Sequence, residues 1–326
     1  MKKSTSFDPI WAPILTHYSS QKELELDSNL IEKHIKWLEP NVKQFLICGT
    51  TGDGWNLNDK LIKDWLNITI KKNLFTEQNK ILFGVFGNNT HDVLKRADII
   101  ERFFIQNQCK AGFIGLTLCA PVGKNNTQKQ IINHFETVIE NTYLPISIYQ
   151  LPQVVKCEIK PETLKYLKEK FENRIVLFKD TSGEDKVINS ELNFGNIKFL
   201  RGAEGDYFNH ISPNGKYDGF LLSSANNFGK ILREIINKVN KDNYLEAEYL
   251  SQKLSRLINN SFNESKSLKF GNPFSNVNKA YAHVLLNKNN YKKISCKTCF
   301  DADIPKDFLE YVYSTLSEYS LVNSLR

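Results

Sequence analysis

Eight short apolar runs alternate along this chain with mostly longer amphipathic stretches, and this alternation limits the folds open to it. The strand-length runs lie at 10–15, 44–48, 81–85, 111–118, 145–149, 175–179, 197–201 and 219–223. The expected helices lie at 28–38, 57–74, 91–106, 127–141, 161–171, 184–190, 205–212 and 227–239. Strands that are each followed by a helix, repeated in this way, are typical of the α/β class and of a closed (β/α)8 TIM barrel.

The main alternative within the α/β class is a doubly wound open sheet, and the turn after the first run argues against it. Such a sheet usually has the pattern G-x-G-x-x-G there, whereas this turn, THYSSQKEL, has no glycine. Three more helical stretches follow the eighth unit, at 242–260, 276–286 and 306–322. We therefore expect a barrel with the active site over 1–240. A C-terminal helical extension over 241–326 would pack on the barrel or at a subunit interface.

The formal net charge of +7 raises the question of an acidic partner. The lysines are scattered and interleaved with Glu and Asn, which is typical of a solvated surface rather than of a nucleic-acid-binding face. No segment has the roughly 18 consecutive apolar residues of a membrane helix, and Asp8 interrupts the start of the chain too early for a signal peptide. These features predict a cytoplasmic protein that binds neither nucleic acid nor a membrane.

Cysteines and histidines are the candidate ligands for a metal ion. Cys296 and Cys299 form a C-x-x-C pair, which is compatible with a redox site or with half of a zinc site. No second Cys or His pair follows at a suitable spacing, so two surface or half-buried thiols are the favoured interpretation. The histidines are scattered as well, and we expect no metal and no cofactor.

The second apolar run ends in FLICGTTGDGWNL, at the carboxyl end of a predicted strand, where barrel enzymes build their active sites. Gly49 and Gly52 allow a close turn, and Thr50 and Thr51 add two hydroxyl groups. The backbone amides of such a turn, with the positive end of the following helix, suit a carboxylate or a phosphate. A plain glycine turn is the alternative.

A lysine and a tyrosine end two other predicted strands. The sixth run ends in IVLFKDTSG, so Lys179 should lie at the barrel rim and point inward. Removal from water lowers the pKa of an ammonium group, and a neutral amine attacks a ketone to form an imine. The alternative is an ion pair with Asp180. The fifth run ends in ISIYQLPQ, which places Tyr149 at the same mouth, as a proton relay or as a packing residue.

Together these motifs resemble those of one family of enzymes. G-T-T-G after strand two, Y-x-x-P after strand five and K-D-T-S-G after strand six are similar to motifs of the dihydrodipicolinate synthase and N-acetylneuraminate lyase family of class I aldolases. The segments GFLLSSAN (219–226) and NPFSNVNKA (272–280) extend the resemblance over nearly the whole chain.

The resemblance implies roles for particular residues. Lys179 matches the lysine that forms the imine, and Tyr149 matches the tyrosine that shuttles protons. Thr50 and Thr51 match the residues that hold the carboxylate of a 2-oxo acid and complete the proton relay, with Thr51 taken as catalytic. The expected substrate-binding residues are Thr50, Gly49, Gly52, Thr181, Ser223 and Glu204.

The chain departs from the family pattern where the second substrate would bind. The synthase branch has adjacent tyrosines after strand four, where this chain has Val122 and Gly123, and an arginine where this chain has Val154. Losing an arginine clamp for a carboxylate is not a conservative change. The lyase branch has acidic residues after strand seven, where RGAEGDY keeps Glu204 and Asp206 but departs from the pattern at Ala203 and Gly205. Residues expected to form the second half-site are Trp55, Val122, Val154 and Glu204.

The predicted function is therefore a class I aldolase or lyase that joins Lys179 to pyruvate or a related 2-oxo acid. Its small-molecule substrates would be a 2-oxo acid and an aldehyde, with a 2-keto-3-deoxy sugar acid as the best fit. The alternatives are 4-hydroxy-tetrahydrodipicolinate (dihydrodipicolinate) synthase and a lapsed paralogue that only binds a 2-oxo acid. A lapsed paralogue would be marked by loss of Lys179 or Tyr149, and both are present. The resemblance also implies a homo-oligomer, a tetramer or a dimer.

Overall fold

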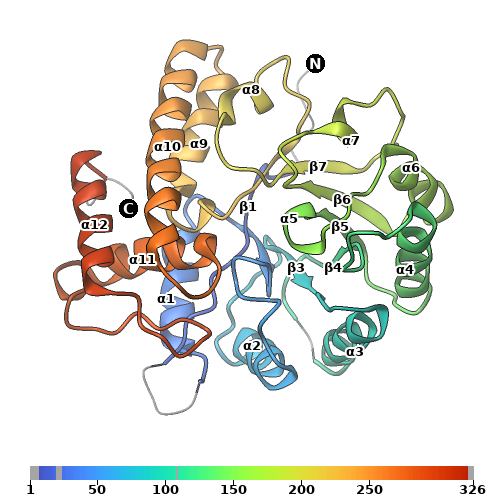
Figure 1. Cartoon of the computed structure of the whole chain (residues 1–326), viewed down its shortest axis with the longest axis horizontal. Coiled ribbons are helices and arrows are strands. Elements are labelled where there is room, and N and C mark those ends of the chain that lie inside the picture. Colours follow the sequence, from blue (N-terminus) through green and yellow to red (C-terminus); the bar gives the residue numbers. More distant parts are fainter. Residues whose placement is uncertain (1–6, 20–23, 108, 322–326) are drawn as a thin grey trace.

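The structure is a computed structural model that describes residues 7–19, 24–107 and 109–321 (Figure 1). Its strands form a closed barrel in the order of the sequence, and each strand pairs in parallel with its neighbours. The strands are β1 (Ile10–Ala12), β2 (Gln44–Ile47), β3 (Lys80–Gly84), β4 (Phe113–Cys119), β5 (Ile146–Gln150), β6 (Ile175–Asp180), β7 (Lys198–Arg201) and β8 (Gly219–Leu221). The predicted (β/α)8 barrel with helices after it is confirmed.

Two apolar layers hold the barrel together. Inside it, buried side chains from six strands form one cluster, made of Trp11, Leu46, Leu82, Leu177, Leu200 and Leu221. A larger cluster fills the space between the strands and the surrounding helices. Because side chains alternate along a strand, Lys179 lies on the same face of β6 as Leu177, the interior face. The inner cluster thus provides the apolar surroundings on the barrel side of Lys179.

The helices around the barrel are α1 (Ser28–Leu38), α2 (Asp59–Lys71), α3 (Thr90–Gln106), α4 (Gln128–Glu140), α5 (Pro152–Val155), α6 (Pro161–Lys170), α7 (Lys186–Asn189), α8 (Tyr207–Ile211) and α9 (Ala225–Val239). Side-chain caps set several of their starts. Asn58 accepts a hydrogen bond from the Leu61 N–H, so α2 begins at Asp59 rather than at residue 57. The four-residue helix α5 was not predicted, because a segment of this length has no helical period to detect.

The extension after α9 consists of α10 (Tyr244–Glu264), α11 (Pro273–Asn287) and α12 (Lys306–Glu318), with short 3-10 turns η1 (Ser265–Ser267) and η2 (Lys288–Asn290). Figure 1 shows it on one side of the barrel, where α10 packs against α9, and α11 contacts α9, α12 and α1. The predicted domain division at residue 240 stays a prediction. Within the described residues, no helix has the length and apolar character needed to span a membrane.

Candidate active site

Lys179 lies at the carboxyl end of β6 with only 3% of its surface exposed. Its Nζ lies 4.1 Å from the centroid of the Tyr149 ring, on the paired strand β5. Burial lowers the pKa of Lys179 from 10.5 to about 7, and the nearby Cys119 and Glu204 oppose this effect. Burial therefore raises the fraction of Lys179 that is neutral near pH 7.

The ion pair of Lys179 with Asp180, the alternative interpretation, is not found. Asp180 points to the opposite face of β6, where its Oδ1 accepts a hydrogen bond from the Ser182 N–H at 2.8 Å. Across the described part of the chain, no carboxylate forms an ion pair with Lys179. A buried amine without an ion-pair partner is suited to nucleophilic attack.

The space for the Lys179 side chain depends on Gly202, which directly follows β7. A Cβ at this position would lie 2.7 Å from Lys179 Cε and 2.4 Å from Thr181 Cγ2. Glycine here therefore lets the lysine lie across the end of β7. Sequence analysis did not assign a role to Gly202, and the only signal for it was a glycine directly after a predicted strand.

The Tyr149 hydroxyl lies between two of the predicted threonines. It is hydrogen-bonded with the side chains of Thr50 and Thr181, while burial raises the pKa of the phenol above its ordinary value. The Thr181 hydroxyl also donates to the Gln150 carbonyl oxygen at 2.6 Å, and the Trp55 Nε1–H donates to Thr50 Oγ1 at 3.2 Å. The protein thus connects Tyr149 to Thr50 rather than to Thr51, the threonine predicted to complete the relay.

The turn after β2 is fixed by a hydrogen bond within it and by a close contact with the segment after β1. Within it, the Gly54 N–H donates to the Gly49 carbonyl at 2.9 Å. A Cβ at Gly52 would lie 2.4 Å from the Ile14 carbonyl oxygen, so the close approach to the segment after β1 requires glycine. Thr51 is buried in this turn. These contacts restrain the conformation of the backbone that carries Thr50 and Thr51.

Glu204 and Ser223 meet at the exits of β7 and β8. The Ser223 hydroxyl donates to Glu204 Oε1 at 2.6 Å, and the Ser224 N–H donates to the same oxygen at 2.9 Å. Glu204 Oε2 accepts from the Ser224 hydroxyl at 2.7 Å and from the Tyr207 hydroxyl at 2.9 Å. Both carboxylate oxygens thus have internal partners, which fixes the negative charge on the side of the site that holds Lys179.

The other residues predicted for the second half-site lie on different elements. Trp55 stacks on Phe86 with ring centroids 5.0 Å apart, and Phe86 in turn packs on Tyr149 at 6.0 Å. Val122 is exposed in the loop after β4, and Val154 is half-buried in α5. The Gly123 N–H donates to the Val155 carbonyl at 2.9 Å, which holds the loop after β4 against α5.

The thiols and imidazoles form no cluster suited to a metal ion among the residues that the structure describes. His17 and His34 contact each other at 3.0 Å, and burial lowers the pKa of both. Cys296 is buried, against the expectation of a surface or half-buried thiol, whereas Cys299 is half-buried as expected. Cys296 is buried because it packs on α11, where its thiol contacts the Lys279 carbonyl at 3.8 Å.

Comparison with known proteins places the chain in a family. The model of the Dihydrodipicolinate synthetase family matches residues 6–290. The chain belongs to this family. Its members are Schiff-base lyases and aldolases, so the chain belongs to a family of enzymes that act on small molecules.

Individual relatives are distant. The chain is 25% identical over 243 residues to a 4-hydroxy-tetrahydrodipicolinate synthase of Methanococcus aeolicus, a match that covers 74% of this chain and 79% of the relative. It is 29% identical over 257 residues to the enzyme of the same name from Karelsulcia muelleri, which covers 77% and 80%.

Solved structures share the fold at lower identity. YagE, a prophage protein of the dihydrodipicolinic acid synthase family from E. coli K12, solved in complex with pyruvate, superimposes with a TM-score of 0.77 at 19% identity and covers 97% of this chain and 99% of its own. KD(P)GA from T. tenax gives a TM-score of 0.71 at 16% identity and covers 96% and 99%.

Proposed function

We propose that this protein is a class I aldolase or lyase in which Lys179 forms a Schiff base with pyruvate or a related 2-oxo acid. The observation that carries the proposal is a lysine at the carboxyl end of β6, buried at the barrel mouth, whose pKa is lowered to about 7. Desolvation supplies the neutral amine that attack on a ketone requires. A family relative of the same fold was solved with pyruvate, which agrees with this substrate class.

In the proposed chemistry, the Lys179 amine attacks the keto carbon, and loss of water gives a protonated imine. Tyr149, hydrogen-bonded with Thr50 and Thr181, passes protons during these steps. The turn with Thr50 and Thr51 holds the substrate carboxylate. The positive imine then withdraws electrons from the adjacent carbon. Either an enamine forms and attacks an aldehyde, or an existing carbon–carbon bond breaks in the reverse direction.

For the second substrate we propose a 2-keto-3-deoxy sugar acid in the cleavage direction, with the matching aldehyde in synthesis. The positions that carry a tyrosine pair and an arginine in the synthase branch are Val122, Gly123 and Val154 in this chain. Without the arginine, this part of the site lacks a bidentate partner for a second carboxylate. An uncharged aldehyde fits such a site better than one that carries a carboxylate.

The alternative is 4-hydroxy-tetrahydrodipicolinate synthase, and the names of the relatives favour it. Identity of 25 to 29% leaves room for a different second substrate. A panel of sugar acids and of the synthase substrates, assayed with a chelator present, separates the two activities. Substitution Val154→Arg should favour the synthase substrate over the sugar acid.

Borohydride reduction in the presence of pyruvate, followed by peptide mass mapping, tests the central step. A pyruvyl adduct on Lys179 is the expected result. Absence of the adduct, under conditions that label a known class I aldolase, would overturn the proposal. An adduct without turnover of any panel member would instead indicate a lapsed paralogue that binds 2-oxo acids.

We further propose a cytoplasmic homo-oligomer, a dimer or a tetramer. The support is the family resemblance, within which a relative described as a monomeric synthase variant also occurs. Light scattering on the purified protein distinguishes the masses of a monomer, a dimer and a tetramer. A monomer at micromolar concentration would contradict the proposal.

A further inference from the structure

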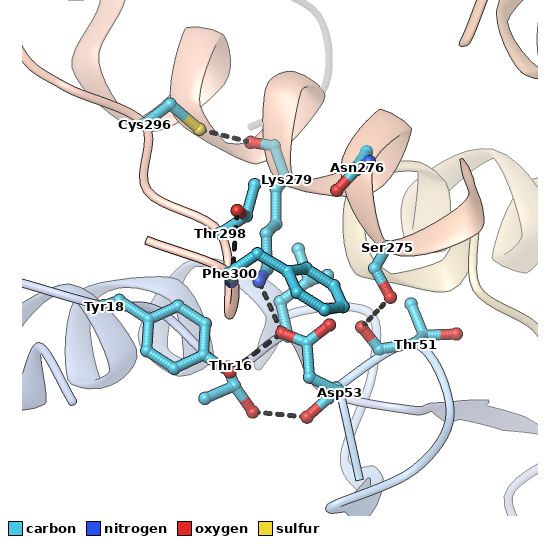
Figure 2. Close-up of polar contacts among 12 residues, drawn as sticks. Thr16, Tyr18, Thr51, Asp53, Ser275, Asn276, Lys279, Cys296, Thr298 and Phe300 are labelled. Carbon is cyan, nitrogen blue, oxygen red and sulfur yellow. Dashed lines mark hydrogen bonds and ion pairs between the residues drawn. The ribbon is translucent and has the colours of Figure 1, made fainter. Parts of the chain in front are cut away.

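A buried ion pair joins the turn after β2 to the C-terminal extension (Figure 2). Lys279 Nζ, from α11, lies 2.5 Å from Asp53 Oδ2, and the two side chains are only 2% and 3% exposed. The Tyr18 hydroxyl donates to the same carboxylate oxygen at 3.0 Å, and Lys279 Nζ lies 4.5 Å from the Tyr18 ring centroid. These contacts leave both charges fully desolvated and partnered.

This pair is unusual in the molecule for its depth and its place. Most ion pairs of the described residues have partners that are at least one-fifth exposed. Replacing a buried ion pair by apolar residues is often neutral or stabilising, so burial of charge is weak evidence for a purely stabilising role. A role in fixing one backbone conformation is the better explanation of a buried pair at this position.

Asp53 belongs to the turn that carries Thr50 and Thr51. It has a positive φ of 61°, and its N–H donates to the Thr50 carbonyl at 3.2 Å. A second residue of α11 contacts the same turn, because the Ser275 hydroxyl donates to the Thr51 carbonyl at 2.9 Å. Figure 2 shows Ser275 and Lys279 reaching from one helix toward this turn. The extension therefore contacts the threonine turn at the Asp53 side chain and at the Thr51 backbone carbonyl.

We propose that Asp53 and Lys279 are positioning residues that set the conformation of the Thr50–Thr51 turn for the carboxylate of the 2-oxo acid, so that α11 is part of the active-site structure. The proposal rests on the proposed function for its ligand. Neither residue contacts Lys179, which lies on β6 and is surrounded by β5 and β7. Loss of the pair should therefore weaken binding of the carboxylate more than it slows the chemistry at the amine.

The test uses the full chain with Lys279→Met, Asp53→Asn and the double variant. Asn accepts the positive φ of position 53 and the hydrogen bond from Tyr18, and the double variant leaves no unpaired charge in the interior. Lys279→Arg keeps the charge and serves as the conservative rescue. The matched control is the double variant Asp8→Asn, Arg233→Met, which removes an ion pair between the segment before β1 and α9, away from the threonine turn.

Two measurements are made on each folded protein. Hydrogen exchange of peptides that span residues 48–57 reports the turn without any ligand. Borohydride trapping at graded pyruvate concentrations gives the half-saturating concentration and the maximal rate separately. We expect faster exchange in this segment and a half-saturating pyruvate concentration raised by about tenfold, the effect of one lost charge-assisted hydrogen bond. The maximal rate should change less.

The outcomes separate the two proposals. Unchanged exchange and unchanged half-saturation in the double variant would overturn the positioning role, as would an equal effect in the Asp8, Arg233 control. Recovery with Lys279→Arg, together with faster exchange only in the other variants, would support it. If the unmodified protein forms no pyruvyl adduct, the proposed function fails, and the exchange measurement alone decides whether the pair sets the turn.

Discussion

Lys179 and Tyr149 occupy paired positions on adjacent strands, with the lysine amine 4.1 Å from the centre of the tyrosine ring. The ring shields the amine from water, and the phenol beyond it is hydrogen-bonded with two threonines. The lysine thus lies beside an aromatic ring, whose contact helps to bury the amine and lower its pKa, and beside a hydroxyl group that can carry its protons. This pairing is a direct result of parallel register, since residues at the ends of neighbouring strands meet at one edge.

Replacement Tyr149→Phe should keep the aromatic ring that shields the Lys179 amine and remove the hydroxyl group that carries protons. We expect kcat to fall by about 10² to 10⁴, the usual contribution of a positioned acid–base group. Lys179 should still be trapped by borohydride, although more slowly, because the amine stays desolvated. Quench-flow trapping beside steady-state rates separates the two effects. An unchanged kcat would show that another group moves the proton.

The pH dependence of imine formation should follow the titration of the Lys179 amine. With the pKa of Lys179 lowered to about 7, the reactive neutral form is lost as the pH falls through 7. The trapping rate at low pyruvate should therefore rise up to about pH 7 and then level off. An ordinary exposed lysine would instead give a rate that still rises near pH 10.

Glu204→Gln should shift this profile in a defined direction. The Glu204 carboxylate raises the pKa of Lys179 against the larger effect of burial, so its removal should lower that pKa further. The midpoint of the profile then moves to lower pH. Glu184→Gln, an exposed change in the loop after β6, is the control and should leave the midpoint in place. A midpoint that stays unchanged in Glu204→Gln would contradict the electrostatic role.

Gly202→Ala should reduce activity without unfolding the protein. The added methyl would lie 2.4 Å from Thr181 Cγ2 and 2.7 Å from Lys179 Cε, so both side chains have to move away. A misplacement of about 1 Å in a reacting group lowers rates by about 10²-fold. Thermal unfolding and trapping rates measured on the same protein test this, with Gly195→Asn as a control. That position has a φ of 64°, which Asn tolerates, and has no atom closer than 3.6 Å.

The barrel could be predicted because buried parallel strands leave continuous apolar runs in the sequence. Element ends were less certain: the expected strand at 10–15 is only Ile10–Ala12, since residues 10–12 are the ones that pair with β2 and β8. The positions of Lys179 and Tyr149 also followed from the runs, because each ends one. Their surroundings did not.

The unpredicted parts of the site depend on contacts between distant segments. Gly202 matters only because the Lys179 side chain crosses it, and no local pattern reveals that crossing. Asp53 and Lys279 are 226 positions apart, and a lone aspartate and a lone lysine are common on any surface. Periodicity identifies which face of an element is buried, but not which buried residues from two elements meet.

Lys179→Met should abolish trapping and stabilise the fold. Lowering the pKa of a buried amine from 10.5 to about 7 corresponds to at most about 5 kcal/mol of unfavourable free energy, so the variant should gain about 2 kcal/mol or more at pH 7. The sign follows from linkage. Between about pH 7 and 10.5 the unfolded chain binds a proton that the folded chain does not, so the stability of the unmodified protein rises with pH and the gap to the variant narrows.

A second buried lysine provides the matched control for this prediction. Lys168 is 6% exposed, but its Nζ donates to the Ile175 carbonyl at 3.1 Å and to Asn196 Oδ1 at 2.7 Å. Lys168→Met removes these donors and should destabilise the protein, whereas Lys179→Met should stabilise it. Denaturant unfolding of both variants at pH 7 and pH 9 measures the two changes. Destabilisation by Lys179→Met would mean that the amine has polar partners that compensate its burial, as those of Lys168 do, although burial lowers the pKa of Lys168 as well.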